Sequence, residues 1–203
     1  MTPIYCDNAK DIATQLLDGK IGIVPCDTIW GLVGIATRDN AIRLAQIKKR
    51  SLSKGFILLI PEPEHVHALC SEIPKTAKAL MDKYWPGPLT LVLPKSKHVP
   101  REITGEHTGI AVRLPKHGLL NEIFTQIDHP LLSSSANESG KTVIQNSSDI
   151  PASLMDAIDF IYTKDQAPSA IASTVVDCQT QDPTLLREGS ISWTEISASF
   201  SET

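Results

Sequence analysis

Short apolar runs and helical apolar patterns follow one another along most of the chain. Apolar runs bounded by glycine, proline or polar clusters are typical of buried strands. The runs that predict strands lie at 21–25, 56–60, 89–93, 110–114, 131–135, 160–162, 174–177 and 185–187. Apolar positions three or four residues apart predict helices at 8–17, 39–49, 74–84 and 119–127. This order predicts an α/β or mixed α+β fold with a sheet of about seven strands.

Turn and capping residues support the predicted helix boundaries. Asp18-Gly19 is a stop signal for the first helix, and Asp39 can cap the start of the second. The segment Pro86-Gly87-Pro88 ends the third helix, because proline cannot continue a helical backbone. Each predicted helix is therefore separated from the next strand by a short break.

The composition is typical of an ordinary globular protein. With 203 residues, of which 41% are hydrophobic, we expect a single domain over 1–203 that needs no metal or disulfide for its core. The formal net charge is −4, whereas a protein that coats nucleic acid is usually basic. The charge argues against an RNA-coating role, although it is compatible with a locally basic pocket.

The cysteines and the apolar runs indicate a cellular compartment. Cys6, Cys26, Cys70 and Cys178 lie far apart and form no C-x-x-C pair. No secretory signal begins the chain, and its longest apolar run, 56–61, is too short to cross a bilayer. We therefore expect a cytoplasmic protein with no membrane partner.

The segment PCDTIWGL at 25–32 directly follows the first predicted strand. Polar side chains at the end of a buried strand often face a cleft, which makes Thr28 a candidate binding residue. The alternative is a plain turn in which Asp27 and Thr28 bond to their own backbone.

Basic residues gather where the second predicted helix ends. Lys48, Lys49, Arg50 and Lys54 lie in the segment KKRSLSK. Cations are favoured at a helix C-terminus by the helix dipole, so this cluster can be a simple solvated end. Alternatively, the loop can direct Lys48, Arg50 and Lys54 toward a polyphosphate, which arginine forks and lysine charges suit well.

A third segment, SSSANESG at 133–140, supplies small hydroxyl and amide side chains at a strand end. Such side chains can reach a ligand without blocking it, or can simply form a loop. Arg113 and Arg187 lie within apolar strands. Either arginine can face water or a concave face of the sheet, since a strand alternates its sides.

Several well-known site motifs are absent from the sequence. The chain contains no P-loop, no dinucleotide-binding glycine motif and no G-x-S-x-G elbow. The spacing of His65 and His67 points their rings to different faces of a helix, so we expect no protein metal site. Cys26 is expected to be a buried small residue and not a nucleophile.

The sequences of these segments and their order along the chain resemble those of the YrdC-like threonylcarbamoyl-AMP synthases, in their short form, over about residues 8–190. The pieces that carry the resemblance are PCDTIWGL at 25–32, IKKR at 47–50, WPGPLT at 85–90, IAVRLP at 110–115, SSSANESG at 133–140, STVVD at 173–177 and LLREG at 185–189. The family fold implies a twisted mixed sheet with flanking helices and a concave basic cavity.

The resemblance also implies a reaction. L-threonine, bicarbonate and ATP would give threonylcarbamoyl-adenylate and pyrophosphate, and downstream enzymes would pass the threonylcarbamoyl group to position 37 of tRNA. Mg²⁺ would be carried by ATP. The family pattern assigns Lys48, Arg50, Ser135 and Asn137 to catalysis and ATP, adds Lys54, Ser133 and Arg187 to the ATP site, and assigns Thr28, Arg113 and Ser173 to threonine.

One departure from the family pattern concerns the basic loop. Ser51 and Gly55 stand where the family usually has proline, so we expect a more mobile loop. Two other functions fit the same resemblance. The protein can be a module that binds double-stranded RNA or tRNA without catalysis, or a paralogue that acts on a different amine.

Overall fold

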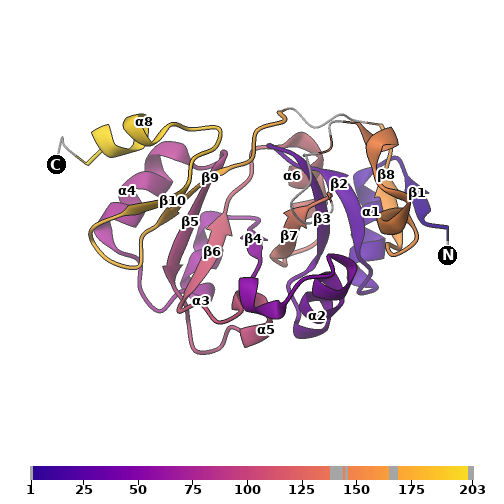
Figure 1. Ribbon diagram of the computed structural model, residues 1–203, viewed down its shortest axis with the longest axis horizontal. Helices are drawn as coiled ribbons and strands as arrows, with labels where there is room; N and C mark the ends of the chain where they lie inside the picture. Colours follow the sequence, from indigo (N-terminus) through magenta and orange to yellow (C-terminus); the bar gives the residue numbers. More distant parts are fainter. Residues whose placement is uncertain (1, 138–143, 145, 165–168, 201–203) are drawn as a thin grey trace.

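The computed structural model describes residues 2–137, 144, 146–164 and 169–200. Within these residues, ten strands form one mixed sheet in the order β1-β8-β2-β3-β7-β4-β6-β5-β9-β10 (Figure 1). The strands are β1 Ile4–Cys6, β2 Gly22–Pro25, β3 Trp30–Ile35, β4 Ile57–Leu59, β5 Leu89–Pro94, β6 Gly109–Arg113, β7 Leu131–Ser135, β8 Phe160–Tyr162, β9 Thr174–Asp177 and β10 Thr184–Arg187. The predicted mixed α/β class is confirmed.

The helices described lie between these strands in the chain, except for the last, which follows β10. They are α1 Ala9–Leu17, α2 Arg38–Ile47, α3 Val66–Leu69, α4 Lys75–Tyr84, α5 Arg101–Thr104, α6 Gly118–Phe124, α7 Ala152–Met155 and α8 Trp193–Ala198, with 3-10 turns η1 Leu52–Lys54, η2 Pro63–His65 and η3 Ser147–Asp149. The longest are α2 and α4, of ten residues each, and no described helix is long and apolar enough to cross a membrane.

The sheet has more strands than the predicted number of about seven. Besides the eight predicted segments it contains β1 and β3, which escaped the sequence pattern. β1 is a three-residue strand at the edge of the sheet, too short to show a period. β3 contains Gly31 and Gly34, and it begins within the segment 25–32, for which a plain turn was the alternative prediction. Tertiary pairing with β2 and β7 makes it a strand in spite of its glycines.

The two faces of the sheet are covered differently. On one face, α1 and α6 pack together, and their buried Ile12, Leu16 and Ile123 meet Val33 and Leu131 of the sheet. Side chains two residues apart share a face, so Gly31 of β3 and Ser133 and Ser135 of β7 continue this same face beyond the helices. That continuation remains open and forms the floor of the site.

The opposite face of the sheet is closed by α2, α4 and α8. Their buried Leu44, Leu80 and Ile196 belong to a larger core that also takes in Leu58 and Leu91 from the central strands. These strands are therefore buried on one side by helices and exposed to the cavity on the other. A firmly packed sheet is a rigid support for the cavity side chains.

Candidate functional site

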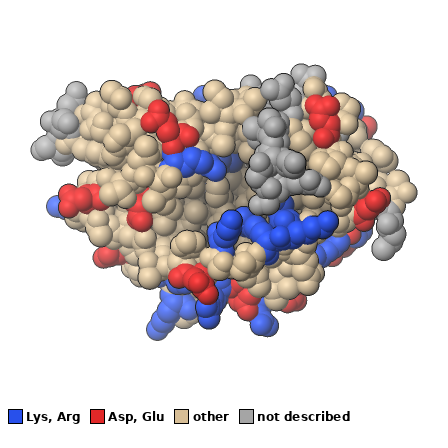
Figure 2. Space-filling model, viewed as in Figure 1, with Lys and Arg blue, Asp and Glu red and all other residues tan. Residues whose placement is uncertain are grey.

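A cavity of about 490 Å³ opens on the part of the sheet that α1 and α6 leave uncovered. Its floor is partly apolar and includes Ile57 of β4, Val92 of β5 and Ala111 of β6. Figure 2 shows lysine and arginine side chains on opposite rims of a hollow in this face. An apolar floor with a few convergent polar groups is typical of a small-molecule site.

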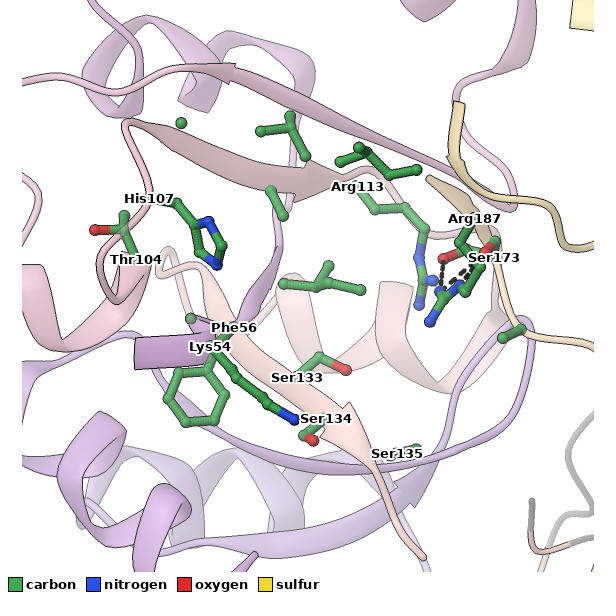
Figure 3. A pocket seen from close by; sticks show the side chains of 18 of the residues that line it. Lys54, Phe56, Thr104, His107, Arg113, Ser133, Ser134, Ser135, Ser173 and Arg187 are labelled. Atoms are coloured by element: carbon green, nitrogen blue, oxygen red, sulfur yellow. Dashed lines mark hydrogen bonds between the residues drawn. The ribbon is translucent and has the colours of Figure 1, made fainter. Parts of the chain in front are cut away.

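Arg113 and Arg187 enter one end of the cavity from β6 and β10 (Figure 3). Nε and Nη2 of Arg187 donate hydrogen bonds to the carbonyl oxygen of Ser173 at 3.1 and 2.9 Å, and Nη2 also donates to its hydroxyl at 3.1 Å. Burial and the positive charge of Arg113 lower the pKa of Arg187. Two cations held this close favour the binding of an anion.

Asp27 offsets part of this positive charge. Its Oδ1 lies 3.1 Å from Nη2 of Arg113, and the two side chains are 4% and 5% exposed. The turn that carries Asp27 is closed by a hydrogen bond from the Cys26 amide to the Ile29 carbonyl at 3.1 Å. This carboxylate pairs with only one of the two arginines, which leaves a net positive charge for a ligand at this end of the cavity.

Unpaired polar atoms also point to a ligand at this end. The hydroxyl of Thr28 and Nε of Arg113 are buried and have no hydrogen-bond partner in the described part of the chain. Leaving a buried polar atom unpaired costs free energy, so each such atom in a native structure calls for an explanation. A ligand with a carboxylate and a nearby polar group would satisfy both atoms.

Arg50 lines another side of the cavity and is folded back on its own loop. Its Nη2 donates to the carbonyl oxygen of Gly55 at 2.5 Å, and its guanidinium carbon lies 4.2 Å from the ring centroid of Phe56. Burial lowers the pKa of Arg50, and its Nε has no hydrogen-bond partner among the described residues. The guanidinium is thus fixed in place with donor capacity to spare.

The loop that follows Arg50 is held by backbone contacts with the α5 segment. The Phe56 amide donates to the Ile103 carbonyl at 2.8 Å, and the Glu106 amide donates to the Ser53 carbonyl at 3.2 Å. Gly55 has a φ of +54°, which proline cannot adopt. These backbone contacts therefore hold the loop, although Gly55 stands where the family usually has proline. The greater mobility expected of this loop stays a prediction.

Lys48 lies beneath the site and not in its wall. It is 6% exposed, and its ammonium group donates to the Ser135 carbonyl at 2.7 Å, to the Asn137 carbonyl, and to the Asn137 side-chain oxygen at 3.4 Å. The hydroxyl of Ser135 donates to the same side-chain oxygen at 2.5 Å. Burial, with a smaller effect from Arg50, lowers the pKa of Lys48 to about 8. Lys48 thereby ties the end of β7 to Asn137.

The structure brings most of the predicted site residues to one cavity. Those that line it are Thr28, Arg50, Lys54, Arg113, Ser133, Ser135, Ser173 and Arg187. Lys48 and Asn137 do not line the cavity. They are bonded to each other and to Ser135, which does line it. The last residues of the third segment, 138–140, lie outside the described residues.

Several further residues that were not predicted from the sequence line the same cavity. They include Phe56, Thr104, His107, Asp177 and Gln179. Asp177 and Gln179 are bonded to each other, since the Gln179 amide nitrogen lies 3.0 Å from a carboxylate oxygen of Asp177. Asp177 follows Ser173 by four residues, so strand alternation could have placed both on one face. Thr104 and His107 carried no such signal.

The cysteines are all buried and unpaired in disulfides. Burial raises the pKa of Cys26 to about 12, so this cavity-lining thiol stays protonated near neutral pH and is a poor nucleophile. Among the described residues, no three histidine, cysteine or acidic side chains gather as a metal site would require.

The family model for Sua5/YciO/YrdC, described as telomere recombination, matches residues 14–189. The threonylcarbamoyl-AMP synthase of Pyrococcus abyssi is 36% identical over 88% of this chain and 53% of its own length. That of Coxiella burnetii is 36% identical over 70% of this chain and 77% of its own. The chain thus spans about half the length of the Pyrococcus relative.

Solved structures also resemble this chain over nearly its whole length. The crystal structure of P. abyssi Sua5 complexed with L-threonine has a TM-score of 0.91 and 31% identity, and the match covers 100% of this chain and 62% of that one. Escherichia coli YciO, at 21% identity and a TM-score of 0.83, shares the fold. The family match covers residues 14–189, which include the cavity residues from Thr28 to Arg187. The chain therefore belongs to the Sua5/YciO/YrdC family, as its YrdC-like segments predict.

Proposed function

We propose that this chain makes L-threonylcarbamoyladenylate from L-threonine, bicarbonate and ATP, with release of pyrophosphate. The observation that carries the proposal is the meeting of Arg50, Lys54, Arg113 and Arg187 around one cavity. The reactants and the leaving group are anionic, so bringing them together requires fixed positive charge. The threonylcarbamoyl-AMP synthases of P. abyssi and C. burnetii, both 36% identical, support this choice of reaction.

The ATP phosphates would lie against Arg50, Lys54 and Arg187. The hydroxyls of Ser133 and Ser135, on the same face of β7, would donate hydrogen bonds to the phosphates or the ribose. Lys48 and Asn137, which the family pattern assigns to ATP, bond to each other and to Ser135 at this strand end; Lys48 is buried and Asn137 is half-buried. We propose that they hold Ser135 in position, so that Lys48, Ser135 and Asn137 act as one unit in catalysis.

L-threonine would occupy the end of the cavity near Arg113. The guanidinium of Arg113 suits the carboxylate of threonine. The unpaired hydroxyl of Thr28 and the hydroxyl of Ser173, which lies beside Arg187, suit the other polar groups of threonine. The relative solved with L-threonine shares the whole fold of this chain, which supports an amino-acid site here. A pocket that hydrogen-bonds the threonine hydroxyl would reject amines that lack it.

The chemistry would proceed in two steps on this surface. The threonine amine takes up bicarbonate-derived carbon dioxide to give a carbamate, and a carbamate oxygen then attacks the α-phosphorus of ATP as pyrophosphate leaves. Mg²⁺ would enter with the ATP phosphates, because it keeps several waters and needs few protein ligands. Asp27 is engaged by Arg113, so we assign it to positioning and not to deprotonation of the amine.

The product would serve tRNA indirectly. Downstream enzymes would transfer the threonylcarbamoyl group to position 37 of tRNA to give N6-threonylcarbamoyladenosine. This proposal places the protein in the cytoplasm, where thiols such as the four free cysteines stay reduced.

The direct test is an omission experiment on the purified protein. We expect pyrophosphate to appear with ATP, Mg²⁺, bicarbonate and threonine, and to be lost when threonine or bicarbonate is left out. Release that serine or another amine supports better than threonine would indicate a paralogue with another substrate. Absence of turnover together with salt-sensitive RNA binding would contradict the proposal and favour an RNA-binding module.

A further inference from the structure

The segment that follows Arg187 is docked on β9 by one buried hydroxyl. Oγ1 of Thr174 donates to the Ile191 carbonyl at 2.5 Å and accepts from the amides of Gly189 and Ile191, both at 3.0 Å. A threonine hydroxyl has one donor and two acceptor positions, so all of its capacity is used here. Thr174 is 0% exposed and points to the helix-covered side of the sheet, so it cannot touch a ligand in the cavity.

The docked segment fits closely against the backbone of the two residues that precede β9. A side chain on Gly189 would place its Cβ 2.2 Å from the Ala172 carbonyl oxygen, so only glycine permits this approach. The Ser190 amide donates to the same carbonyl at 3.0 Å. The backbone two residues beyond Arg187 is therefore fixed to the residues on either side of Ser173.

The pairing of β9 with β10 explains how Arg187 reaches the cavity side. Thr184 lies opposite Asp177 and Leu185 opposite Val176, but Arg187 lies opposite Val175, so the strand has one extra residue. Unbroken alternation from Thr184 would send Leu186 to the cavity and Arg187 to the far side. The bulge brings both to the cavity, where both are lining residues.

Arg187 thus sits between a bulge and a docked segment, and it faces a like charge. Its bonds to Ser173 oppose the repulsion from Arg113, which would otherwise drive the two guanidinium groups apart. Release of the docked segment would free the backbone beside Arg187 and allow its side chain to leave this position.

We propose that Thr174 is a positioning residue for Arg187, acting through the segment Gly189–Ile191 that its hydroxyl holds. The inference rests on the proposed function only for the ligand that Arg187 meets, which is the phosphate chain of ATP. Thr174 is then part of the ATP site without touching ATP.

The test is a double-mutant cycle read out by ATP binding in calorimetry. Thr174→Val keeps the shape and removes the hydroxyl, and we expect it to weaken ATP binding about tenfold, whereas Thr174→Ser stays within about twofold. In an Arg187→Met background, Thr174→Val should weaken binding no further. Equal losses in both backgrounds, or no loss in the first, would overturn the proposal.

Two controls keep this test separate from folding and from the proposed function. Thr76→Val on α4 removes another buried hydroxyl, one that does not line the cavity, and should leave ATP binding unchanged. If the wild-type protein binds no ATP, the proposed function fails. Crystal structures of wild type and Thr174→Val then decide the positioning role: Arg187 displaced from the Ser173 carbonyl supports it, and Arg187 unmoved rejects it.

Discussion

The ammonium nitrogen of Lys48, a residue that is 6% exposed, lies 2.7 Å from the carbonyl oxygen of Ser135. Lys48, which the family pattern assigns to ATP, is thus bonded to the protein backbone and does not line the cavity. Its charge reaches the site through the turn that carries Ser135 and Asn137. This relationship makes the site sensitive to the protonation of a group that substrate need not touch.

ATP affinity should therefore fall at alkaline pH. The pKa of Lys48 is lowered to about 8, so the side chain is a cation below that pH and becomes neutral as pH rises through it. Loss of the charge and of a donor should weaken ATP binding by up to about tenfold per pH unit above the pKa. Calorimetric titrations with ATP between about pH 7.5 and 9.5 would measure this fall.

Two substitutions locate the source of this pH dependence. Lys48→Arg keeps the charge throughout this range, so the fall should move to higher pH even if ATP binds more weakly overall. Lys49→Arg alters the neighbouring residue, which does not line the cavity, and should keep the wild-type profile. A wild-type affinity that is constant across the range would show that Lys48 does not govern the site.

Removing the charge of Asp27 should destabilise the fold strongly. Asp27→Asn keeps the size of the side chain but leaves Arg113 as a buried cation without its carboxylate partner. Breaking such a buried pair costs about 3–5 kcal/mol of the free energy of unfolding. The exposed pair of Lys78 and Asp82 provides the control, since Asp82→Asn should cost less than about 1 kcal/mol. Urea unfolding of both variants would compare them, and equal small losses would contradict a structural role for the Asp27–Arg113 pair.

The glycine contact behind the basic loop should be intolerant of a side chain. Gly105 has a φ of +67°, and a Cβ there would lie 2.2 Å from the Ser53 carbonyl oxygen and 2.7 Å from the Gly55 amide nitrogen. Gly105→Ala should cost about 1–3 kcal/mol of unfolding free energy and weaken ATP binding, because the loop carries Lys54 and braces Arg50.

A glycine elsewhere supplies the matched control. Gly118 begins α6, and a Cβ added to it would meet nothing within 4 Å, so Gly118→Ala should leave stability the same or slightly higher. Thermal unfolding and ATP calorimetry on both variants would test this contrast. If Gly105→Ala binds ATP as wild type does, the loop does not depend on this contact.

Arg50 and Lys49 are neighbours with opposite expected importance. Arg50→Ala removes a fixed, cavity-lining guanidinium and should lower kcat/KM for pyrophosphate release by about a hundredfold. Lys49→Ala should stay within about twofold, because Lys49 is exposed and lies outside the cavity lining. Equal and mild losses for the two variants would indicate that the basic segment is only a solvated helix end.

Most elements could be predicted from the sequence because apolar runs determine burial directly. All eight predicted strand segments occur as β2 and β4 to β10, whereas β3 depends on pairing with its neighbours and begins beside a turn motif. The side of the sheet reached by Arg187 depends on a bulge in β10, which shifts its register by one residue. No local pattern in LLREG encodes that shift.

The site shows the same division between local and tertiary information. The resemblance identified most of the polar lining, but it could not show that Lys48 bonds backward to Ser135 or that Asp27 pairs with Arg113. Those contacts join residues that are distant in the chain, so they follow from strand order. Thr104 and His107 enter the cavity for the same reason, because η1 and α5 pack together.

The most direct measurement follows the carbon of labelled bicarbonate. Wild-type protein is incubated with ¹⁴C-bicarbonate, ATP, Mg²⁺ and L-threonine, and the products are separated and identified by mass. We predict label in an adenylate that contains threonine, present only when all components are supplied and greatly reduced by Arg50→Ala. Pyrophosphate formed without label in such an adenylate, or label that does not depend on threonine, would contradict the proposed reaction.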